Sequence, residues 1–352
     1  MSWFLGDLVE RNISRKVLLS ICIVGISLMI LDFLFSLISE ISDLTDSYSL
    51  YDAFVYSFFL IPVSLNEYLS YICLLGVLIG LGSLKEEGEM IATKTLGKSN
   101  FRILIASLRP ALLLILVGFI FQETKLPSLS QSNEEERLIK QNRISLEDGY
   151  WFASGSEISY FKSSPNRQSI IEIQIFELDE GWDIERIINS KSATRKGSSW
   201  ILNNPEIINI KGGHKSSESS LIWNSAPTQK DMRRILSPKY LSILELKETI
   251  DDEVSEYKRN NLSLEFWRKI FHPVSCIILI FLASSFIFSQ IRDQNLGQRL
   301  LGGVIFAFSF DVAQNLFESM AVVSFLEPFV AVVLPITFVF IVTIVIWRWK
   351  PS

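Results

Sequence analysis

Six apolar runs constrain the fold of this chain more than any other feature of its sequence. Each is close to the roughly 20 apolar residues that cross a hydrocarbon core of about 30 Å, which predicts a transmembrane helix. The runs cover residues 17–38, 65–84, 101–121, 264–288, 300–323 and 329–347. The chain is therefore predicted to be an α-helical membrane protein with six spans.

The second run is part of a longer apolar stretch, residues 53–84. A single helix of that length would extend about 48 Å, so the stretch must break, and Pro62 and the polar pair at 66–67 mark the predicted place. After the break comes a small-residue face that lets another helix approach closely. Its predicted helix-packing residues are Gly76, Gly80 and Gly82.

Charged residues lie mainly between the apolar runs. They make up 20% of the 352 residues, and the region that holds most of them, residues 123–262, has the size of a soluble domain. The net charge of -5 includes no basic run of the kind that binds nucleic acid. The three cysteines fall inside predicted spans, at a spacing that fits neither a metal site nor a disulfide framework.

The distribution of Lys and Arg predicts the orientation of the spans. If the N-terminus is cytoplasmic, the two short outside loops, residues 39–52 and 322–328, contain no basic residue, whereas the inside segments contain twelve. Both termini are therefore predicted to be cytoplasmic, and residues 123–262 periplasmic. Asp32, near the outer end of the first span, either faces a cavity or a partner, or snorkels to the interface.

The periplasmic insert shows the period-two pattern of β-strands. Residues 171–175 alternate isoleucine with polar residues, and similar runs lie at 149–152, 158–161, 200–202, 207–210 and 221–223. Many short strands separated by turn residues indicate an antiparallel sandwich or jelly roll. Beyond residue 238 the apolar spacing becomes helical, which predicts an amphipathic linker helix before the fourth span. Its apolar positions are Leu246, Ile250, Val254 and Tyr257. The predicted organisation is thus three spans in 1–122, a β-jelly roll with a linker helix in 123–262, and three spans in 263–352.

Residues 85–96 form a charged, helix-compatible segment between the second and third spans, and Gly97 ends it. Gly97-Lys98-Ser99 resembles the end of a P-loop, but Ala92 stands where that motif needs glycine. The sequence contains no H-E-x-x-H or G-x-S-x-G motif and only two histidines. It therefore predicts no catalytic residue, metal site or cofactor in this chain. If a chain with this architecture were a transporter, it would have to take its energy from another subunit.

Two blocks of the sequence resemble a known family, and the resemblance covers essentially the whole chain. The first block is GLGSLKEEGEMIATKTLGKS, from Gly80, with Gly88 where serine is usual in the family. The second is FWRKIFHPVSCIILIFLASSFIFSQIRDQNLGQRLLGGVIFAFSF, from Phe266. With three spans on each side of a β-rich domain, these blocks make the chain similar to the permeases that extract lipopolysaccharide from the bacterial inner membrane. These permeases are the paired F and G subunits of the Lpt transporter, and the second block is more like the G subunit.

The resemblance implies a set of partners. The family forms an F–G heterodimer on a dimeric cytoplasmic ATPase, which binds ATP and Mg, and the helix at 85–96 would dock in a groove of that ATPase. Lipopolysaccharide would pass from the paired permeases to a continuous β-bridge. The bridge would be built with a single-span periplasmic protein of C type and a periplasmic protein of A type, by strand addition at sheet edges.

The resemblance also implies roles for single residues in the coupling helix. The expected coupling residues are Glu87, Glu89, Met90, Ile91, Lys94 and Gly97. Glu89 would be the acidic contact to the ATPase, whereas Met90 and Ile91 would supply apolar docking contacts. Glu86 and Glu87 replace more basic or neutral family residues, which implies a more basic groove on the ATPase.

The lipid is expected to enter between the first and fifth spans of the paired subunits. The candidate cavity residues are Asp32, Phe33, Phe35, Arg299, Phe310 and Phe317. Their aromatic rings could accept acyl chains, although lipid-facing or packing roles explain the same residues equally well. Relatives often carry bases suited to lipid phosphates near the outer end of the first span. This chain instead carries Asp32, Glu40, Asp43 and Asp46. Positive charge is therefore expected from the partner subunit or a divalent ion.

Other interpretations stay open at this point. A membrane-anchored receptor or scaffold with a periplasmic ligand-binding β-domain would have the same spans and insert, and the F-type subunit of the same transporter would share the coupling motif. Lipoprotein-release and macrolide-export permeases are also driven by an ATPase, but they usually have four spans.

Overall fold

The structure is a computed structural model of the chain. It describes residues 7–45, 47–125, 129, 132–133, 136–137, 140–141, 150–164, 169–179, 181–197, 199–210, 213–228, 231, 238–288 and 296–348. Contacts divide the chain into two compact units. One unit is Met1–Phe35, Ile61–Leu126 and Ser242–Ser352, and the other is Ser36–Leu60 and Pro127–Leu241.

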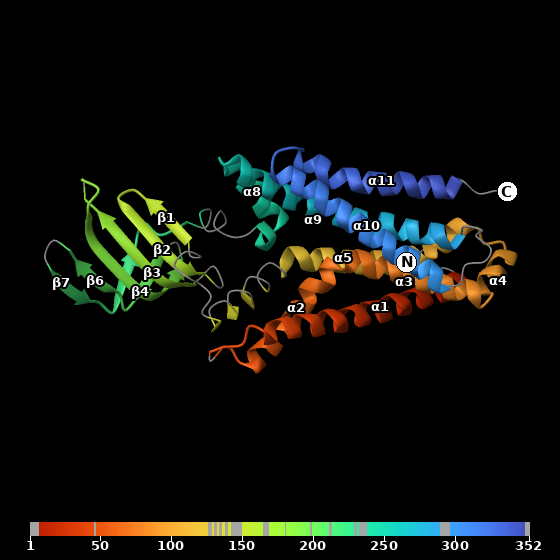
Figure 1. Cartoon of the computed structure of the whole chain (residues 1–352), viewed down its shortest axis with the longest axis horizontal. Helices are drawn as coiled ribbons and strands as arrows, with labels where there is room; N and C mark the ends of the chain where they lie inside the picture. The colour runs from red at the N-terminus through yellow and green to blue at the C-terminus, as the bar shows by residue number, and fades with distance from the viewer. Residues whose placement is uncertain are drawn as a thin grey trace. The chain divides into compact units, whose positions relative to one another are not determined.

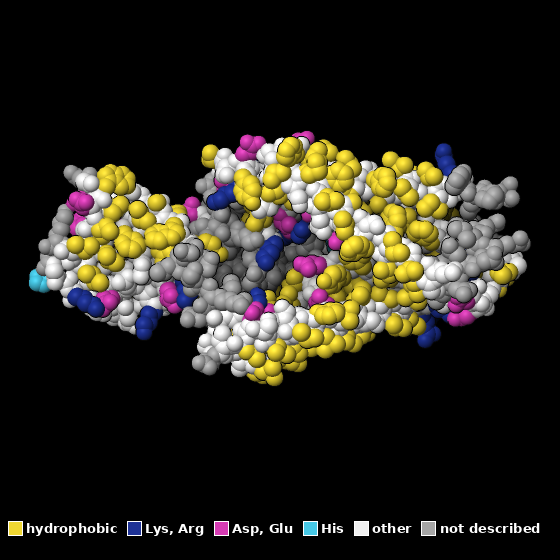
Figure 2. Space-filling model, viewed as in Figure 1, with side chains coloured by type: hydrophobic (Ala, Val, Ile, Leu, Met, Phe, Trp, Pro, Cys, Tyr) yellow, Lys and Arg dark blue, Asp and Glu magenta, His cyan; other side chains and the backbone are white. Residues whose placement is uncertain are grey.

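The first unit is built from helices (Figure 1). Six helices are long and apolar enough to cross a membrane, which confirms the six predicted spans. They are α1 (Leu8–Ile41), α3 (Leu69–Glu86), α5 (Asn100–Thr124), α9 (Glu256–Phe288), α10 (Leu296–Val322) and α11 (Pro328–Arg348). The span of α10 begins at Leu300. On the face drawn in Figure 2, hydrophobic side chains cover much of these helices, as lipid-facing spans require.

The long apolar stretch breaks where polar residues interrupt it. Helix α2 (Leu50–Glu67) ends at Glu67, and α3 begins at Leu69 after Tyr68, whose φ of -87° and ψ of 3° are not helical. Pro62 lies inside α2 and does not end it, so the break follows the polar pair rather than the proline. Helix α3 is the most enclosed span and contributes Leu74, Leu78 and Leu81 to the helical core.

The predicted glycine face brings α1 against α3. A Cβ atom on Gly76 would lie 2.6 Å from the Cα of Ile21, and one on Gly80 would lie 2.8 Å from the Cα of Val17. Both distances are too short for carbon atoms, so only glycine permits this approach. Gly82 is also buried in α3. The close contact lies at the half of α1 that is nearer to its N-terminus.

The second unit contains an antiparallel β-sheet, which confirms the predicted class of the insert. The strands are β1 (Tyr150–Ser154), β2 (Glu157–Ser163), β3 (Ser169–Leu178), β4 (Ile184–Lys196), β5 (Ser199–Asn203), β6 (Glu206–Asn209), β7 (His214–Ser217) and β8 (Ser220–Trp223). Their order is β1-β2-β3-β4-β5-β8, while β6 pairs with β4 and β7 pairs with β6. Figure 1 shows β4 as a long strand within this sheet.

Strand β4 organises the sheet, although the sequence did not predict it. One edge of β4 pairs with β3, and the other pairs with β6 through residues 186–189 and with β5 through residues 192–196. The expected inward set of isoleucines also needs correction. Ile170, Ile173 and Ile175 are buried, whereas Ile171 is half-buried, because Glu172 has a φ of 51° and interrupts the alternation.

The linker helix is shorter than its apolar spacing predicts. Helix α8 (Ile243–Asp252) starts with a capping box, in which Ser242 and Glu245 satisfy each other's backbone N–H groups. It ends before Glu253, whose backbone is extended. Leu246 is buried as expected, but Val254 is 93% exposed, so the predicted apolar stripe does not continue beyond α8. Residues from Glu256 onward belong to α9.

Candidate functional site

A short helix joins the ends of α3 and α5 and forms the first candidate site. Helix α4 spans Glu89–Thr95, so the predicted helix at 85–96 is corrected at its start. Lys85 and Glu86 continue α3, and the chain turns at Gly88, whose φ of 77° lies in the left-handed region. Figure 1 shows α4 beyond the ends of α3 and α5.

Gly97 ends α4 as the sequence indicates. The N–H of Gly97 donates to the carbonyl oxygen of Lys94 at 2.9 Å, and the N–H of Lys98 donates to that of Thr93 at 3.3 Å. This is the Schellman pattern, which needs a left-handed residue at Gly97, where φ is 80°. Ser99 then caps α5 by accepting a hydrogen bond from the N–H of Arg102. The two glycines therefore set both ends of α4.

The side chains of α4 divide into an outer and an inner set. Ile91 is 67% exposed, as is Leu96 just after the helix, and Lys94 is also exposed. Met90 is only 5% exposed and packs into the helical core. We name Ile91, Lys94 and Leu96 the α4 surface. Met90 therefore packs beneath the exposed face of α4, in the helical core, and is not exposed for the docking contact expected of it.

Glu89 is held by residues of α1. Its carboxylate accepts hydrogen bonds from Lys16 at 2.8 Å and from the amide of Asn12 at 3.0 Å. The hydrogen bond from the Lys16 ammonium lowers the pKa of Glu89 below its ordinary value; burial opposes this shift, and the Asn12 amide adds to it. Lys16 also pairs with Glu87. The two predicted acidic coupling residues thus share a cation, which sequence reasoning had assigned only to membrane orientation.

A second group of charges lies on the other side of α4. Glu10 accepts from Arg109 at 3.0 Å and from Lys98 at 3.4 Å, and Lys98 also pairs with Asp7 at 3.2 Å. Glu10 and Lys98 are 14% and 11% exposed in their side chains, so these pairs are partly shielded from solvent. Residues at the start of α1 therefore contact the chain on both sides of α4.

The predicted cavity residues do not share one environment. Phe35 is exposed, Phe310 is buried in the helical core, and Phe317 packs against that core. Phe33 is half-buried, and Asp32 lies near the Tyr68 hydroxyl, a polar group within the chain. The side chain of Arg299 lies outside the described residues.

Two exposed apolar stripes are more continuous than the predicted wall. Residues three or four apart fall on one face of a helix. On α1 the exposed residues at this spacing are Ile23, Ile26, Ile30 and Leu34, and on α10 they are Leu301, Ile305, Phe308, Val312 and Leu316. These stripes could not be predicted from the sequence, because both helices are apolar on all sides. Only packing separates their buried face from their exposed face.

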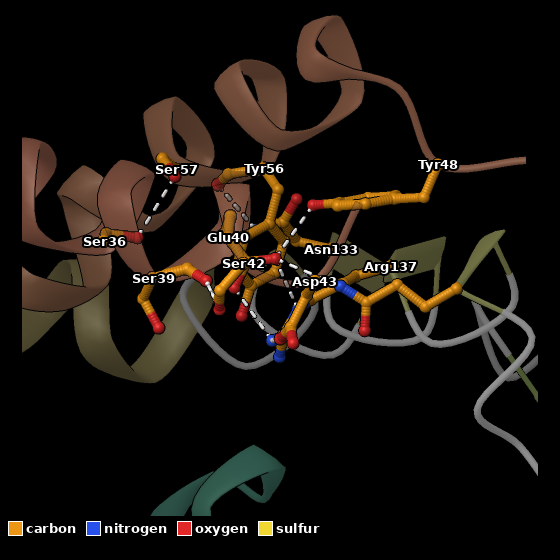
Figure 3. A network of polar contacts seen from close by, with 11 residues as sticks. Ser36, Ser39, Glu40, Ser42, Asp43, Tyr48, Tyr56, Ser57, Asn133 and Arg137 are labelled. Atoms are coloured by element: carbon orange, nitrogen blue, oxygen red, sulfur yellow. Dashed lines mark hydrogen bonds and ion pairs between the residues drawn. The ribbon is translucent and has the colours of Figure 1, made fainter. Parts of the chain in front are cut away.

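In the second unit, the acidic residues beyond the first span are paired within the chain (Figure 3). Glu40 and Arg137 form a two-pronged ion pair, and the Tyr48 hydroxyl donates to the same carboxylate at 3.0 Å. Burial and this hydrogen bond raise the pKa of the Tyr48 phenol, which keeps it a donor. Arg137 also contacts Asp43 and lies over the ring of Tyr56. Asp46 lies outside the described residues.

Comparison with known proteins identifies the family of this architecture. The sequence family described as lipopolysaccharide export system permease LptF/LptG matches residues 11–349. The chain belongs to this family. Its six spans, inserted β-sheet and family membership make it a multi-pass inner-membrane protein of a lipopolysaccharide export system.

Two curated members of the family are similar to the chain over most of its length. The lipopolysaccharide export system permease protein LptG of Haemophilus influenzae is 26% identical over 331 residues, which are 90% of this chain and 91% of the relative. The LptG protein of Escherichia coli K12 is 23% identical over 308 residues, which are 85% of this chain and 86% of the relative. The expected family is thus confirmed.

Within this family, nothing in the described part of the chain indicates a metal centre. No group of three or more His, Cys, Asp or Glu residues in that part lies close enough together to hold a metal ion. Cys73 and Cys276 are buried, whereas Cys22 is exposed. The candidate sites described above are the α4 surface and the apolar stripes of α1 and α10.

Proposed function

We propose that this chain is the G-type permease subunit of an ATP-driven transporter that extracts lipopolysaccharide from the inner membrane and passes it to a periplasmic β-bridge. The observation that carries the proposal is helix α4, a short element that joins two spans and exposes apolar side chains outside them. Such an element can receive a push from a soluble partner and transmit it to the spans. Both curated relatives described above are named as lipopolysaccharide export permeases.

The partner at the α4 surface is a cytoplasmic ATPase dimer, which binds ATP and Mg. Ile91 and Leu96 are large apolar side chains that would gain free energy by leaving water, and the Lys94 ammonium lies between them in sequence. Interfaces depend on a few such anchors surrounded by polar groups. In this arrangement α4 and both termini face the cytoplasm, and residues 123–262 face the periplasm.

The stripes of α1 and α10 are the surfaces for lipid and for the paired F-type subunit. Their exposed aliphatic and aromatic residues suit acyl chains and the spans of a second permease. Closure of the ATPase dimer would narrow the cavity between the two permeases and move the lipid outward. Arg137 is already paired with Glu40 and Asp43, so it does not offer its charge to the lipid phosphates. The positive charge for these phosphates comes from the partner subunit or a divalent ion.

The β-sheet of the insert provides edges for the bridge. Among the described strands, β1 and β8 end the main sheet order, so each has a backbone edge that another strand can extend. A single-span partner of C type and a periplasmic partner of A type would continue the sheet by strand addition.

The central experiment tests the α4 surface. Ile91→Asp places a charge where the proposal puts an apolar contact, and we expect loss of ATPase from the purified complex together with loss of lipopolysaccharide at the cell surface. Leu244→Asp in α8 is the matched control, because it makes the same kind of change at another exposed apolar residue. If Ile91→Asp keeps both the ATPase and the export of lipopolysaccharide, the proposed docking is wrong. Purification of the unmodified protein without any ATPase would favour a receptor or scaffold.

A further inference from the structure

The start of α1 is fastened to the chain on both sides of α4. Before the body of α4, Lys16 contacts Glu87 and Glu89, and Asn12 donates to Glu89. After α4, Lys98 contacts Asp7 and Glu10, while Glu10 also accepts from Arg109. We call the first group the front clasp and the second group the rear clasp. Helix α4 lies between them.

The clasps are reinforced by packing of the same turns of α1. Ile13 and Val17 are buried in the helical core, and the Ser14 hydroxyl donates to the carbonyl oxygen of Ala106 at 2.7 Å. A lone exposed ion pair contributes little to stability. Here, however, several charged pairs share partners and sit beside buried apolar contacts, so separating α1 from α4 would break them together.

The rest of α1 is held differently. Gly76 and Gly80 of α3 bring that helix against Ile21 and Val17 of α1. Further along, the stripe at Ile23, Ile26, Ile30 and Leu34 is exposed in the described part of the chain. Helix α1 is thus attached firmly at the end where α4 lies and presents its other half outward.

We propose that α4 and the first turns of α1, from Leu8 to Ile21, move as one rigid body, so that a displacement of α4 becomes a displacement of the first span. Lys16 and Glu10 are then positioning residues for transport. This inference rests on the proposed function, because an ATPase must move α4. It adds that the push reaches the exposed stripe of α1 directly through the two clasps, in addition to the covalent path through α3 and α5.

The inference gives Glu89 a role other than the expected contact to the ATPase. If Glu89 serves to bind Lys16, export requires only that positions 16 and 89 carry opposite charges. If it contacts the ATPase, its own sign matters whatever stands at position 16. A charge exchange separates these two roles.

The first experiment uses Lys16→Glu, Glu89→Lys and the double variant in the complete transporter. We expect each single change to reduce export of lipopolysaccharide about fivefold or more while the ATPase still copurifies, and the double variant to recover most of the loss. Arg15→Glu is the matched control, since it reverses a charge at an exposed neighbour on the same turn. Loss of the ATPase in Glu89→Lys, or a double variant no better than the singles, would overturn the inference.

The second experiment asks whether the two elements must separate during transport. Cysteines replace Asn12 and Glu89 in a variant that lacks Cys22, Cys73 and Cys276, and a short, reducible bis-thiosulfonate joins them. This variant lacks Asn12 and Glu89 of the front clasp, so we expect its export to be reduced before cross-linking. Cross-linking should keep that export or raise it, because elements that move together tolerate a bond between them. A large loss of export that reductant restores would overturn the inference. An unmodified complex without ATPase or without lipid export would instead refute the proposed function.

Discussion

Glu40 and Arg137 are 97 residues apart in the sequence, and their side chains meet in a two-pronged ion pair. Nη2 of Arg137 lies 2.8 Å from one carboxylate oxygen, and Nε lies 2.8 Å from the other. Gln141 and Tyr48 donate to the same carboxylate, which is only 4% exposed. The end of α1 is therefore tied to a segment that follows α5.

Removal of the arginine should be costly, because it leaves a buried carboxylate without its cation. We expect Arg137→Met to lower the stability of the second unit by about 3 kcal/mol, seen as a fall of about 5–10 °C in the thermal midpoint followed by tryptophan fluorescence. Adding Glu40→Gln should recover part of this loss. Lys215→Met is the control, because it breaks an exposed pair with Glu206 and should change the midpoint little. If both Met variants lower the midpoint equally, Arg137 does not stabilise the fold by neutralising the buried Glu40 carboxylate.

The neighbouring Asp52 should make stability depend on pH. Lys140, followed by the hydroxyl and backbone N–H of Ser49, lowers the pKa of Asp52 to about 2. Because the pKa of Asp52 in the folded chain is depressed from 3.8, the ionised Asp52 contributes to the stability of the fold. This contribution to stability is fully present above about pH 4 and is lost as pH falls toward 2. We expect the midpoint difference between the natural chain and Asp52→Asn to be constant from about pH 7 to 5 and to shrink below about pH 4. A difference that shrinks near neutral pH would show that another group is responsible.

The contact between α1 and α3 should not tolerate a methyl group. A Cβ on Gly76 would meet the backbone of Ile21, which cannot move away as a flexible side chain can. We expect Gly76→Ala to lower the free energy of unfolding by about 1–3 kcal/mol, as in overpacked cores, and so to lower the thermal midpoint. Gly302→Ala is the matched control in α10, since nothing lies within 4 Å of a Cβ at that position. If both variants melt alike, the close approach of α1 and α3 does not depend on Gly76.

Local sequence patterns predicted most helices and strands of this chain, because each pattern depends only on residues that are close in the sequence. Apolar length gave the spans, and the polar pair at 66–67 gave the break before α3. Turn residues and alternation gave most strands. Strand β4 was missed because its sequence, IERIINSKSATRK, follows no clean alternation. Pairing with three other strands, rather than its own pattern, makes it a strand.

Contacts between distant residues could not be predicted in this way. The local sequence around Lys16 indicates only a basic residue at the end of a span. It does not predict a contact with Glu89, which lies 73 residues later. The same holds for Arg137 and Glu40. Met90 and Ile91 are neighbours with similar chemistry, yet one is buried and the other is exposed. That difference depends on how α4 packs against α3 and the helical core, which the sequence of α4 alone does not specify.

The start of α4 depends on glycine in a way that substitutions can measure. Gly88 has a φ of 77°, and a Cβ there would touch nothing within 4 Å, so a side chain would meet backbone strain and no steric clash. Gly88→Ala should therefore cost about 1–2 kcal/mol in the conformation that presents the α4 surface. Affinity for the ATPase should fall about fivefold or more, whereas Gly88→Asn should lose less, because asparagine tolerates this conformation. Gly88→Ser should behave like Gly88→Ala, because serine also carries a Cβ that disfavours the left-handed conformation. Equal binding of the ATPase by the Ala and Asn variants would mean that the left-handed turn at Gly88 does not set the position of α4.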